Sequence, residues 1–143
     1  MGDALALADA ATAVGEVPVG AVVVRNGNII GRGHNRTRID HDPTAHAEIV
    51  AIREAARFLG NDRLEDCDLW ATLEPCTMCA GAIAHARIRR LYYAADDPKG
   101  GGVDNGVRFF DAPTCHHKPD VYAGIEAERS TAMLQEFFRK RRD

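Results

Sequence analysis

The sequence predicts an α/β fold in which helices pack on a mixed sheet. Apolar, β-branched segments alternate with segments of helical periodicity, turn residues separate them, and no linker or internal repeat divides the chain. The chain has 143 residues, the length of one ordinary domain. We therefore expect a single domain over residues 1–143.

The elements of the first part follow from composition and turn residues. Residues 3–14 are rich in Ala and Leu and predict a helix, which Gly15 ends. Residues 17–24 are apolar and β-branched, which favours a buried strand. Asn26-Gly27 is a two-residue turn signal, so we expect residues 28–33 to return as a second strand.

The middle of the chain continues the alternation of helix and strand. After a polar loop, residues 44–59 have helical periodicity, and Gly60 ends this helix. Residues 68–73 predict a strand, residues 77–86 a short helix of small side chains, and residues 88–95 a further strand.

The last part begins with a loop and ends with a helix. Residues 96–106 are rich in Gly and Asp, so they predict a loop. We expect a helical turn at 107–110, a brief strand at 120–122 and a final helix over 127–141. The expected core contacts of this last helix are Leu134, Phe137 and Phe138, and at most one of the two phenylalanines can face outward.

Composition excludes several classes of protein. Hydrophobic residues make up 45% and charged residues 27%, as in soluble globular chains, and no apolar run approaches the ~20 residues of a membrane-spanning helix. The N-terminus lacks a basic start and carries Asp3 and Asp9, so we expect no secretory signal and a cytoplasmic location. In that compartment, paired cysteines with a distant histidine indicate metal binding rather than disulfides.

The net charge of −3 gives no overall case for a nucleic-acid partner, but positive charge is clustered. Residues 139–142 form a basic run, and Arg87, Arg89 and Arg90 form a second cluster. A basic run of this kind is as often a solvated helix end as a phosphate-binding surface.

Cys76, Cys79 and His46 form a candidate metal site. A spacing of three places both sulfurs on one face of a helix's first turn, where the helix dipole favours the thiolate form. His46 lies at the start of another predicted helix. Three such ligands favour zinc and leave it one open position, as in catalytic zinc sites.

Glu48 is the candidate acid/base beside this site. Zinc lowers the pKa of a water molecule in its open position to about 7, and a nearby carboxylate can carry the protons. Residues two apart on a regular helix do not share a face. Glu48 therefore reaches the water only if the first turn is irregular or the side chain curls back.

Other interpretations of the cysteines compete with a catalytic site. A closed structural zinc site needs a fourth ligand, and neither His85, Cys67 nor Cys115 has a standard spacing from the Cys-x-x-Cys pair. A Cys-x-x-Cys pair alone can also be a redox pair, and a nucleophilic dyad of His46 and Cys76 would leave Cys79 and Glu48 without a role. We expect Cys67 to be a buried apolar residue and residues 115–117, Cys-His-His, to form a surface loop rather than a second metal cluster.

Several strings of the sequence narrow the chemistry. His46-Ala47-Glu48 and Pro75-Cys76-Thr77-Met78-Cys79 match the H-x-E and P-C-x-x-C signature of zinc-dependent nucleobase deaminases. The longer strings EVPVGAVVV, HDPTAHAEIVAIR, TLEPCTMCAGAIAHARIRRLYY and FFRKRR resemble the bacterial tRNA-specific adenosine deaminases of the cytidine/deoxycytidylate deaminase superfamily. The likeness covers nearly the whole chain, although those enzymes usually have several more residues before the first helix.

This resemblance implies a fold and a reaction. The fold would be a three-layer α/β/α sandwich with a mixed, roughly five-stranded sheet, assembled as a homodimer with no membrane partner. The reaction would convert the wobble adenosine of a tRNA anticodon to inosine. One Zn²⁺ per subunit would be held by His46, Cys76 and Cys79, with Glu48 as the acid/base.

Two further residues take substrate roles by the same resemblance. Asn35 matches the asparagine that hydrogen-bonds the flipped base, and its amide can both donate and accept. Phe138 matches an aromatic residue of the C-terminal helix that could stack on the anticodon loop, beside arginines that could meet phosphate.

Two other functions remain open. A deaminase of free bases or nucleosides, of the guanine or cytosine type, would share the zinc signature, whereas the basic C-terminal run favours RNA. A non-catalytic RNA-binding subunit would have no need of Glu48. The apolar helix surface at residues 80–84 is our candidate for a dimer contact.

Overall fold

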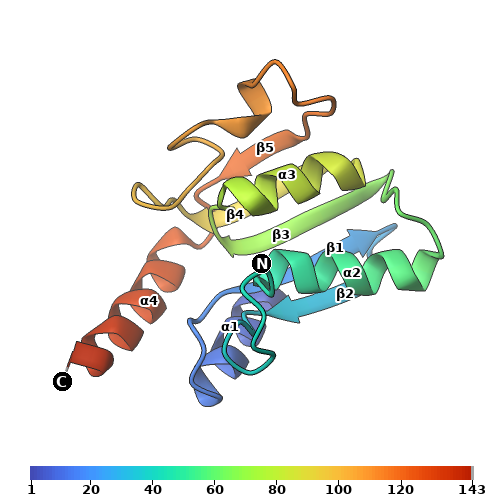
Figure 1. The fold of residues 1–143 in the computed structure, drawn as a ribbon. Helices are drawn as coiled ribbons and strands as arrows, with labels where there is room; N and C mark the ends of the chain where they lie inside the picture. Colours follow the sequence, from blue (N-terminus) through green and yellow to red (C-terminus); the bar gives the residue numbers. More distant parts are fainter. Residues whose placement is uncertain (143) are drawn as a thin grey trace.

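The computed structural model describes residues 1–142 and contains a five-stranded mixed sheet (Figure 1). The strand order is β2-β1-β3-β4-β5. The β2, β1 and β3 strands run antiparallel, and β3, β4 and β5 run parallel. Their bounds are β1 Gly20–Arg25, β2 Asn28–His34, β3 Cys67–Leu73, β4 Arg90–Ala95 and β5 Asp120–Ala123. The expected mixed sheet is confirmed.

Helices cover both faces of the sheet and complete the three expected layers (Figure 1). Helix α2 (Ala47–Leu59) packs on β1 and β2, and α3 (Thr77–Ala86) lies beside it on the same face. Helices α1 (Gly2–Ala13) and α4 (Ala127–Arg142) cover the opposite face. A short 3₁₀ turn, η1, spans Phe109–Asp111 next to α3. No helix within the described residues is long and apolar enough to cross a membrane.

Two glycines of β2 allow α2 to lie directly on the sheet. A Cβ atom on Gly31 would approach the carbonyl oxygen of Ala51 to 2.3 Å, and one on Gly33 would approach that of Ala47 to 2.4 Å. Such distances are far below van der Waals contact, so only glycine permits this approach. The start of α2 is thereby fixed against the end of β2.

Several element boundaries differ from the sequence predictions. Strand β1 begins at Gly20 rather than at residue 17, because Pro18 has no N–H to donate and the Val19 N–H bonds to the Val17 carbonyl. Helix α2 begins at residue 47 rather than 44, because His46 is extended, with φ −72° and ψ 154°. Strand β4 begins at residue 90 rather than 88, after Arg87 ends α3 in a left-handed conformation.

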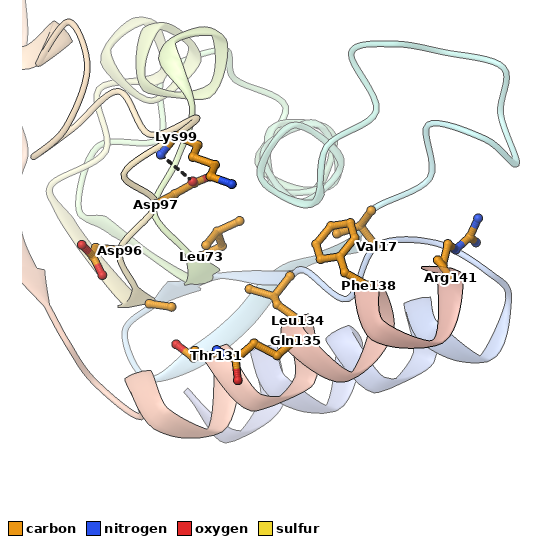
Figure 2. Close-up of a pocket in the computed structure, with 11 residues that line it drawn as sticks. Val17, Leu73, Asp96, Asp97, Lys99, Thr131, Leu134, Gln135, Phe138 and Arg141 are labelled. Atoms are coloured by element: carbon orange, nitrogen blue, oxygen red, sulfur yellow. Dashed lines mark hydrogen bonds between the residues drawn. The ribbon is translucent and has the colours of Figure 1, made fainter. Parts of the chain in front are cut away.

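The two phenylalanines of the C-terminal helix lie in different environments. Phe137 is 8% exposed, and Leu134 packs against the core as expected. Phe138 is 47% exposed, so the prediction that it contacts the core is wrong. It is the one phenylalanine of the pair that faces outward, as the comparison of the two residues allowed. Figure 2 shows Phe138 and Leu134 projecting from α4 beside Val17 and Leu73.

The small residues of α3 are not a free dimer surface. Ala80 is fully buried and Ala84 is 6% exposed, because both pack into the core between α3 and the sheet. The expected contact surface at residues 80–84 is therefore reduced to the half-buried Gly81 and Ala82.

Candidate active site

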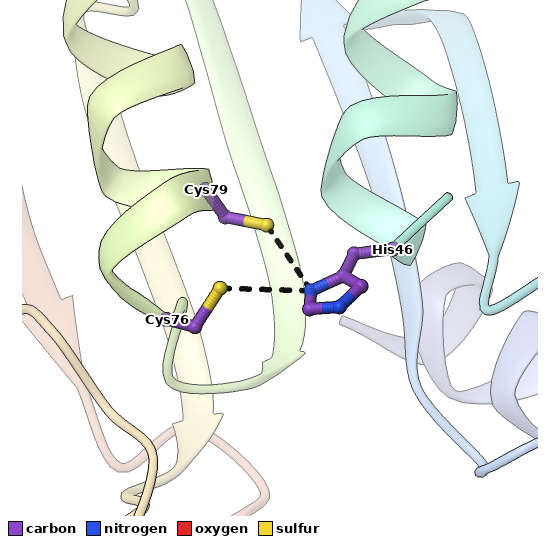
Figure 3. Close-up of side chains that lie close together, drawn as sticks. All are labelled: His46, Cys76 and Cys79. Carbon is purple, nitrogen blue, oxygen red and sulfur yellow. Dashed lines mark hydrogen bonds between the residues drawn. The ribbon is translucent and has the colours of Figure 1, made fainter. Parts of the chain in front are cut away.

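Two helices begin side by side at one edge of the sheet. His46 is the residue before α2 and Cys76 is the residue before α3, and both have extended backbones. Because α2 and α3 pack against each other, the two helix starts face one another (Figure 3). Cys79 lies in the first turn of α3 and points to the same space.

The side chains of these three residues have the spacing of zinc ligands. His46 Nδ1 lies 3.6 Å from Cys76 Sγ and 3.5 Å from Cys79 Sγ, and the three atoms lie within 4.8 Å of one another. Tetrahedral zinc with ordinary bond lengths places such nitrogen and sulfur atoms about 3.6 Å apart. The residues therefore fit a zinc ion, with Nδ1 as the histidine ligand. Within residues 1–142, no second group of this kind forms around Cys115.

The cysteine pair already favours one thiolate. Hydrogen bonds from the Cys79 thiol and then from His46 lower the pKa of Cys76 to about 4. The pKa of Cys79 is raised, because its thiol donates to Cys76 and because it is buried. The pKa of His46 is raised by its hydrogen bond with Cys76. A negative sulfur thus faces the imidazole, as a cation site requires.

Glu48 lies next to this trio in the first turn of α2. Its side chain is 4% exposed, and burial raises the pKa of its carboxyl group, while the nearby His46 acts in the opposite direction. The carboxyl also hydrogen-bonds with Cys79. Residues two apart on a regular helix point in different directions, but this does not separate His46 from Glu48. His46 precedes the helix, so it need not share a helical face with Glu48.

Asn35 follows β2 and lies at the same edge of the sheet. Its N–H donates to the Val19 carbonyl at 3.1 Å, and the N–H of the next residue, Arg36, donates to the Ala45 carbonyl at 2.9 Å. Asn35 is half-buried. The second bond holds the two ends of the loop together, and Asn35 and His46 each adjoin one of the residues that it joins.

The loop between Asn35 and His46 is anchored by a buried carboxylate. Glu16 is 1% exposed and accepts the backbone N–H groups of Arg38 and Ile39 at 3.1 Å each. Glu16 was not among the residues predicted from the sequence to shape the site. Its contacts span more than twenty residues, which no local pattern indicates.

A cavity of about 790 Å³ opens at the edge of the sheet where β3 and β4 end (Figure 2). We call it the groove. Its walls come from α4 and from the loop after β4, and include Leu73, Asp97, Lys99, Phe138 and Arg141. Among these residues, only Phe138 was predicted from the sequence as a substrate contact.

Much of the C-terminal basic run is engaged within the chain. Arg139 and Lys140 pair with Glu136, at 2.7 and 3.6 Å. Arg141 donates to the Gly15 carbonyl at 2.6 Å and lies over the Phe137 ring, 4.6 Å from its centroid. The side chain of Arg142 lies outside the described part of the structure. Phosphate binding would therefore compete with these internal contacts.

The loop over residues 96–106 packs against the candidate metal ligand Cys76 and the residue before it. The Gly102 N–H donates to the Pro75 carbonyl at 2.9 Å, and Gly101 forms a β-bridge with Cys76. This segment was predicted only as a loop. Its Gly and Asp residues indicated a turn-rich segment but gave no sign of its partner.

Known proteins share both the sequence and the architecture. A model of the MafB19-like deaminase family matches residues 1–142. The tRNA-specific adenosine deaminase of Agrobacterium fabrum is 61% identical over 127 residues, which cover 89% of this chain and 84% of the relative. A structure from a study of A-to-I editing by tRNA:A34 deaminases at the wobble position is 58% identical, with a TM-score of 0.92, over 94% of this chain and 97% of that one. A guanine deaminase from Nitrosomonas europaea is 28% identical, with a TM-score of 0.81, over 95% of this chain and 81% of that one.

Proposed function

We propose that this chain, which belongs to the MafB19-like deaminase family, converts the wobble adenosine of a tRNA anticodon to inosine. The relative from Agrobacterium fabrum and the A34 deaminase structure support this substrate. The single observation that carries the chemistry is the buried Glu48 carboxyl beside one nitrogen and two sulfurs at zinc-ligand spacing.

One Zn²⁺ ion would be held by His46 Nδ1, Cys76 Sγ and Cys79 Sγ. When bound, it would act as a Lewis acid that activates the attacking water. The chemistry of the donors supports zinc, because two sulfurs and one imidazole are soft or borderline ligands and a three-residue set leaves a coordination position open.

Glu48 would move the protons of the reaction. Its carboxylate takes a proton from the attacking water while the water oxygen bonds to C6 of adenine, and passes that proton to the adjacent ring nitrogen. Glu48 then takes the remaining proton from the new hydroxyl group on C6 and gives it to the amino group, so that the C6–N bond breaks, a C6 carbonyl forms and ammonia leaves. Because burial raises the pKa of Glu48, the group can hold a proton closer to neutral pH than an exposed glutamate.

Asn35 and Phe138 would bind the substrate. Asn35 would hydrogen-bond the edge of the flipped base, since an amide offers both a donor and an acceptor. Phe138 would stack on a nucleotide of the anticodon loop, because its exposed ring lines the groove.

We further propose that residues 1–143 form one zinc-dependent deaminase domain that acts as a cytoplasmic homodimer. A tRNA substrate is found in the cytoplasm, which supports that location. Two copies would provide a larger surface for a tRNA than one 15.6 kDa chain offers. Sedimentation of the purified protein would test the dimer.

A deamination assay on two kinds of substrate tests the function. An arginine tRNA anticodon stem-loop with adenosine at the wobble position is incubated beside a panel of free bases and nucleosides. Inosine in the stem-loop and no turnover in the panel is the expected result. Turnover of a free base with an inert stem-loop would overturn the RNA substrate and leave the deaminase chemistry in place.

A deaminase of free bases or nucleosides is the second candidate. The guanine deaminase from Nitrosomonas europaea shares the fold, which favours this alternative. Salt dependence separates the two, because phosphate contacts release counterions and a free base has none. We expect stem-loop binding to weaken steeply as salt rises.

A further inference from the structure

Glu74 lies in the chain between Leu73, which lines the groove, and Cys76, a candidate metal ligand. It follows β3 directly and precedes Pro75 and Cys76, and its side chain is 2% exposed. Its backbone N–H donates to the carbonyl of Ala95 at the end of β4, at 2.8 Å. A buried carboxylate needs several hydrogen-bond donors to be tolerated, and here one loop supplies them.

The carboxylate of Glu74 accepts hydrogen bonds from several residues of the loop that follows β4. Oε2 accepts the backbone N–H groups of Val103, Asp104 and Asn105, at 3.1, 2.9 and 3.0 Å. Oε1 accepts the backbone N–H of Asp97 at 2.9 Å and the side-chain amide of Asn105 at 2.6 Å. Donors from both ends of the loop therefore converge on one side chain.

Two glycines of the loop allow it to pack closely against this carboxylate and against the start of α3. A Cβ atom on Gly101 would lie 2.5 Å from the Glu74 carboxyl, and one on Gly102 would lie 2.6 Å from the Thr77 nitrogen. The loop thus lies tightly between Glu74 and the start of α3. Asp97 and Lys99, at its beginning, form part of the groove wall.

We infer that Glu74 is a positioning residue for substrate binding, which holds the loop over residues 97–105 as one wall of the groove. It acts through that loop and does not touch the reacting atoms. The inference rests on the proposed function, since it concerns how the same site receives its RNA.

A loosened loop affects binding more than chemistry. If only about one molecule in ten has the loop in place, the apparent affinity falls about tenfold, because the competent fraction limits binding. Saturating substrate draws the loop back into place, so turnover at saturation is retained. Although Gly101 bridges to Cys76, the positions of the three candidate ligands are set mainly by the packing of α2 against α3, so we expect zinc to remain stoichiometric.

The test is Glu74→Gln in the zinc-loaded full chain, with the anticodon stem-loop as substrate. Glutamine keeps the shape but replaces one acceptor oxygen by an NH₂ group, so at least two of the donors that surround Glu74 lose their acceptor in either orientation. We expect KM to rise about tenfold while kcat stays within about twofold and zinc remains stoichiometric. Amide hydrogen exchange should accelerate at Asp97 and at residues 103–105.

Asn105→Ala is a milder second variant, because it removes one of the same hydrogen bonds at a half-buried position. It should raise KM in the same direction by a smaller factor. Leu64→Ala and Ile88→Val serve as controls, since both side chains are fully buried at the opposite end of the sheet. They lower stability without touching the loop.

The inference is overturned if KM in both loop variants rises no more than in the two core controls. It is also overturned if kcat and zinc content fall together in Glu74→Gln, which would place the effect at the metal centre. Wild-type protein that leaves the stem-loop unchanged but deaminates a free base would overturn the RNA substrate instead. In that case the exchange rates at residues 97 and 103–105 still decide whether Glu74 holds the loop.

Discussion

Replacing Gly33 by alanine would move the start of α2 and so perturb the active site without changing any of its residues. The new Cβ would lie 2.4 Å from the Ala47 carbonyl oxygen and 2.7 Å from the Ala51 nitrogen. Both are backbone atoms of the helix, which cannot rotate away as a side chain can. Ala47 lies between His46 and Glu48, so its displacement moves both.

The size of the effect follows from these distances. Ordinary contact begins near 3.4 Å, so the first turn of α2 must retreat by about 1 Å. Overpacking of this kind costs about 1–3 kcal/mol of stability. A misplacement of about 1 Å in catalytic groups lowers the rate by up to about 100-fold. We therefore expect the deamination rate to fall by much more than the loss of folded protein alone would cause.

The matched control is Gly31→Ala, whose Cβ would lie 2.3 Å from the Ala51 carbonyl oxygen, one turn further along the same helix. Thermal unfolding and single-turnover deamination of the stem-loop are measured for both variants. We expect similar losses of stability, with the larger loss of activity in Gly33→Ala. Equal losses of activity in the two variants, or full activity in Gly33→Ala, would refute the reasoning.

Three further predictions concern single side chains. Glu48→Ala should keep its zinc and lose ~10²- to 10⁴-fold in turnover, measured by metal analysis and stem-loop deamination, because the proton carrier is removed. Cys76→Ala should lose zinc and unfold at a lower temperature; stoichiometric zinc in this variant would refute Cys76 as a ligand. Burial raises the pKa of Glu74, but its N–H donors lower it more, to below the usual 4.5. Its stabilisation is therefore complete above pH 4.5 and lost as the pH falls through the lower folded-state pKa, so the stability gap between wild type and Glu74→Gln in urea unfolding should narrow in acid.

The order of elements and the three residues that lie together as candidate metal ligands could be predicted from the sequence, because both follow from local patterns. Alternating composition gave five strands and the helices between them, and the Cys76–Cys79 spacing gave two sulfurs on one helical turn. Boundaries were less predictable. The apolar residues 17–19 look like strand, yet they lie before β1, because Pro18 interrupts the hydrogen-bonding pattern.

The features that the sequence did not predict depend on contacts between segments that are distant in the chain. Glu74 meets its donors 23 to 31 residues later, and nothing in the local sequence of either segment marks the pairing. The charge pattern of the C-terminal run likewise does not show which internal partners its basic side chains have. Within residues 139–141, Arg139 and Lys140 pair with Glu136 one turn earlier on the same helix, whereas Arg141 donates to the Gly15 carbonyl, which the packing of α4 against α1 brings near.

The two motifs become a site through the sheet rather than through their own spacing. His46 enters from the antiparallel half, at the start of the helix that covers β1 and β2, and the cysteines enter from the parallel half after β3. The β1–β3 ladder joins the halves, with Ala21 opposite Ala71, and sets how far apart the two helices lie. The depth of α2 on the sheet is set by Gly31 and Gly33. The 3.5 Å approach of His46 to Cys79 is thus a consequence of packing at glycines that carry no chemistry themselves, which is why H-x-E and P-C-x-x-C indicate a metal centre only within this fold.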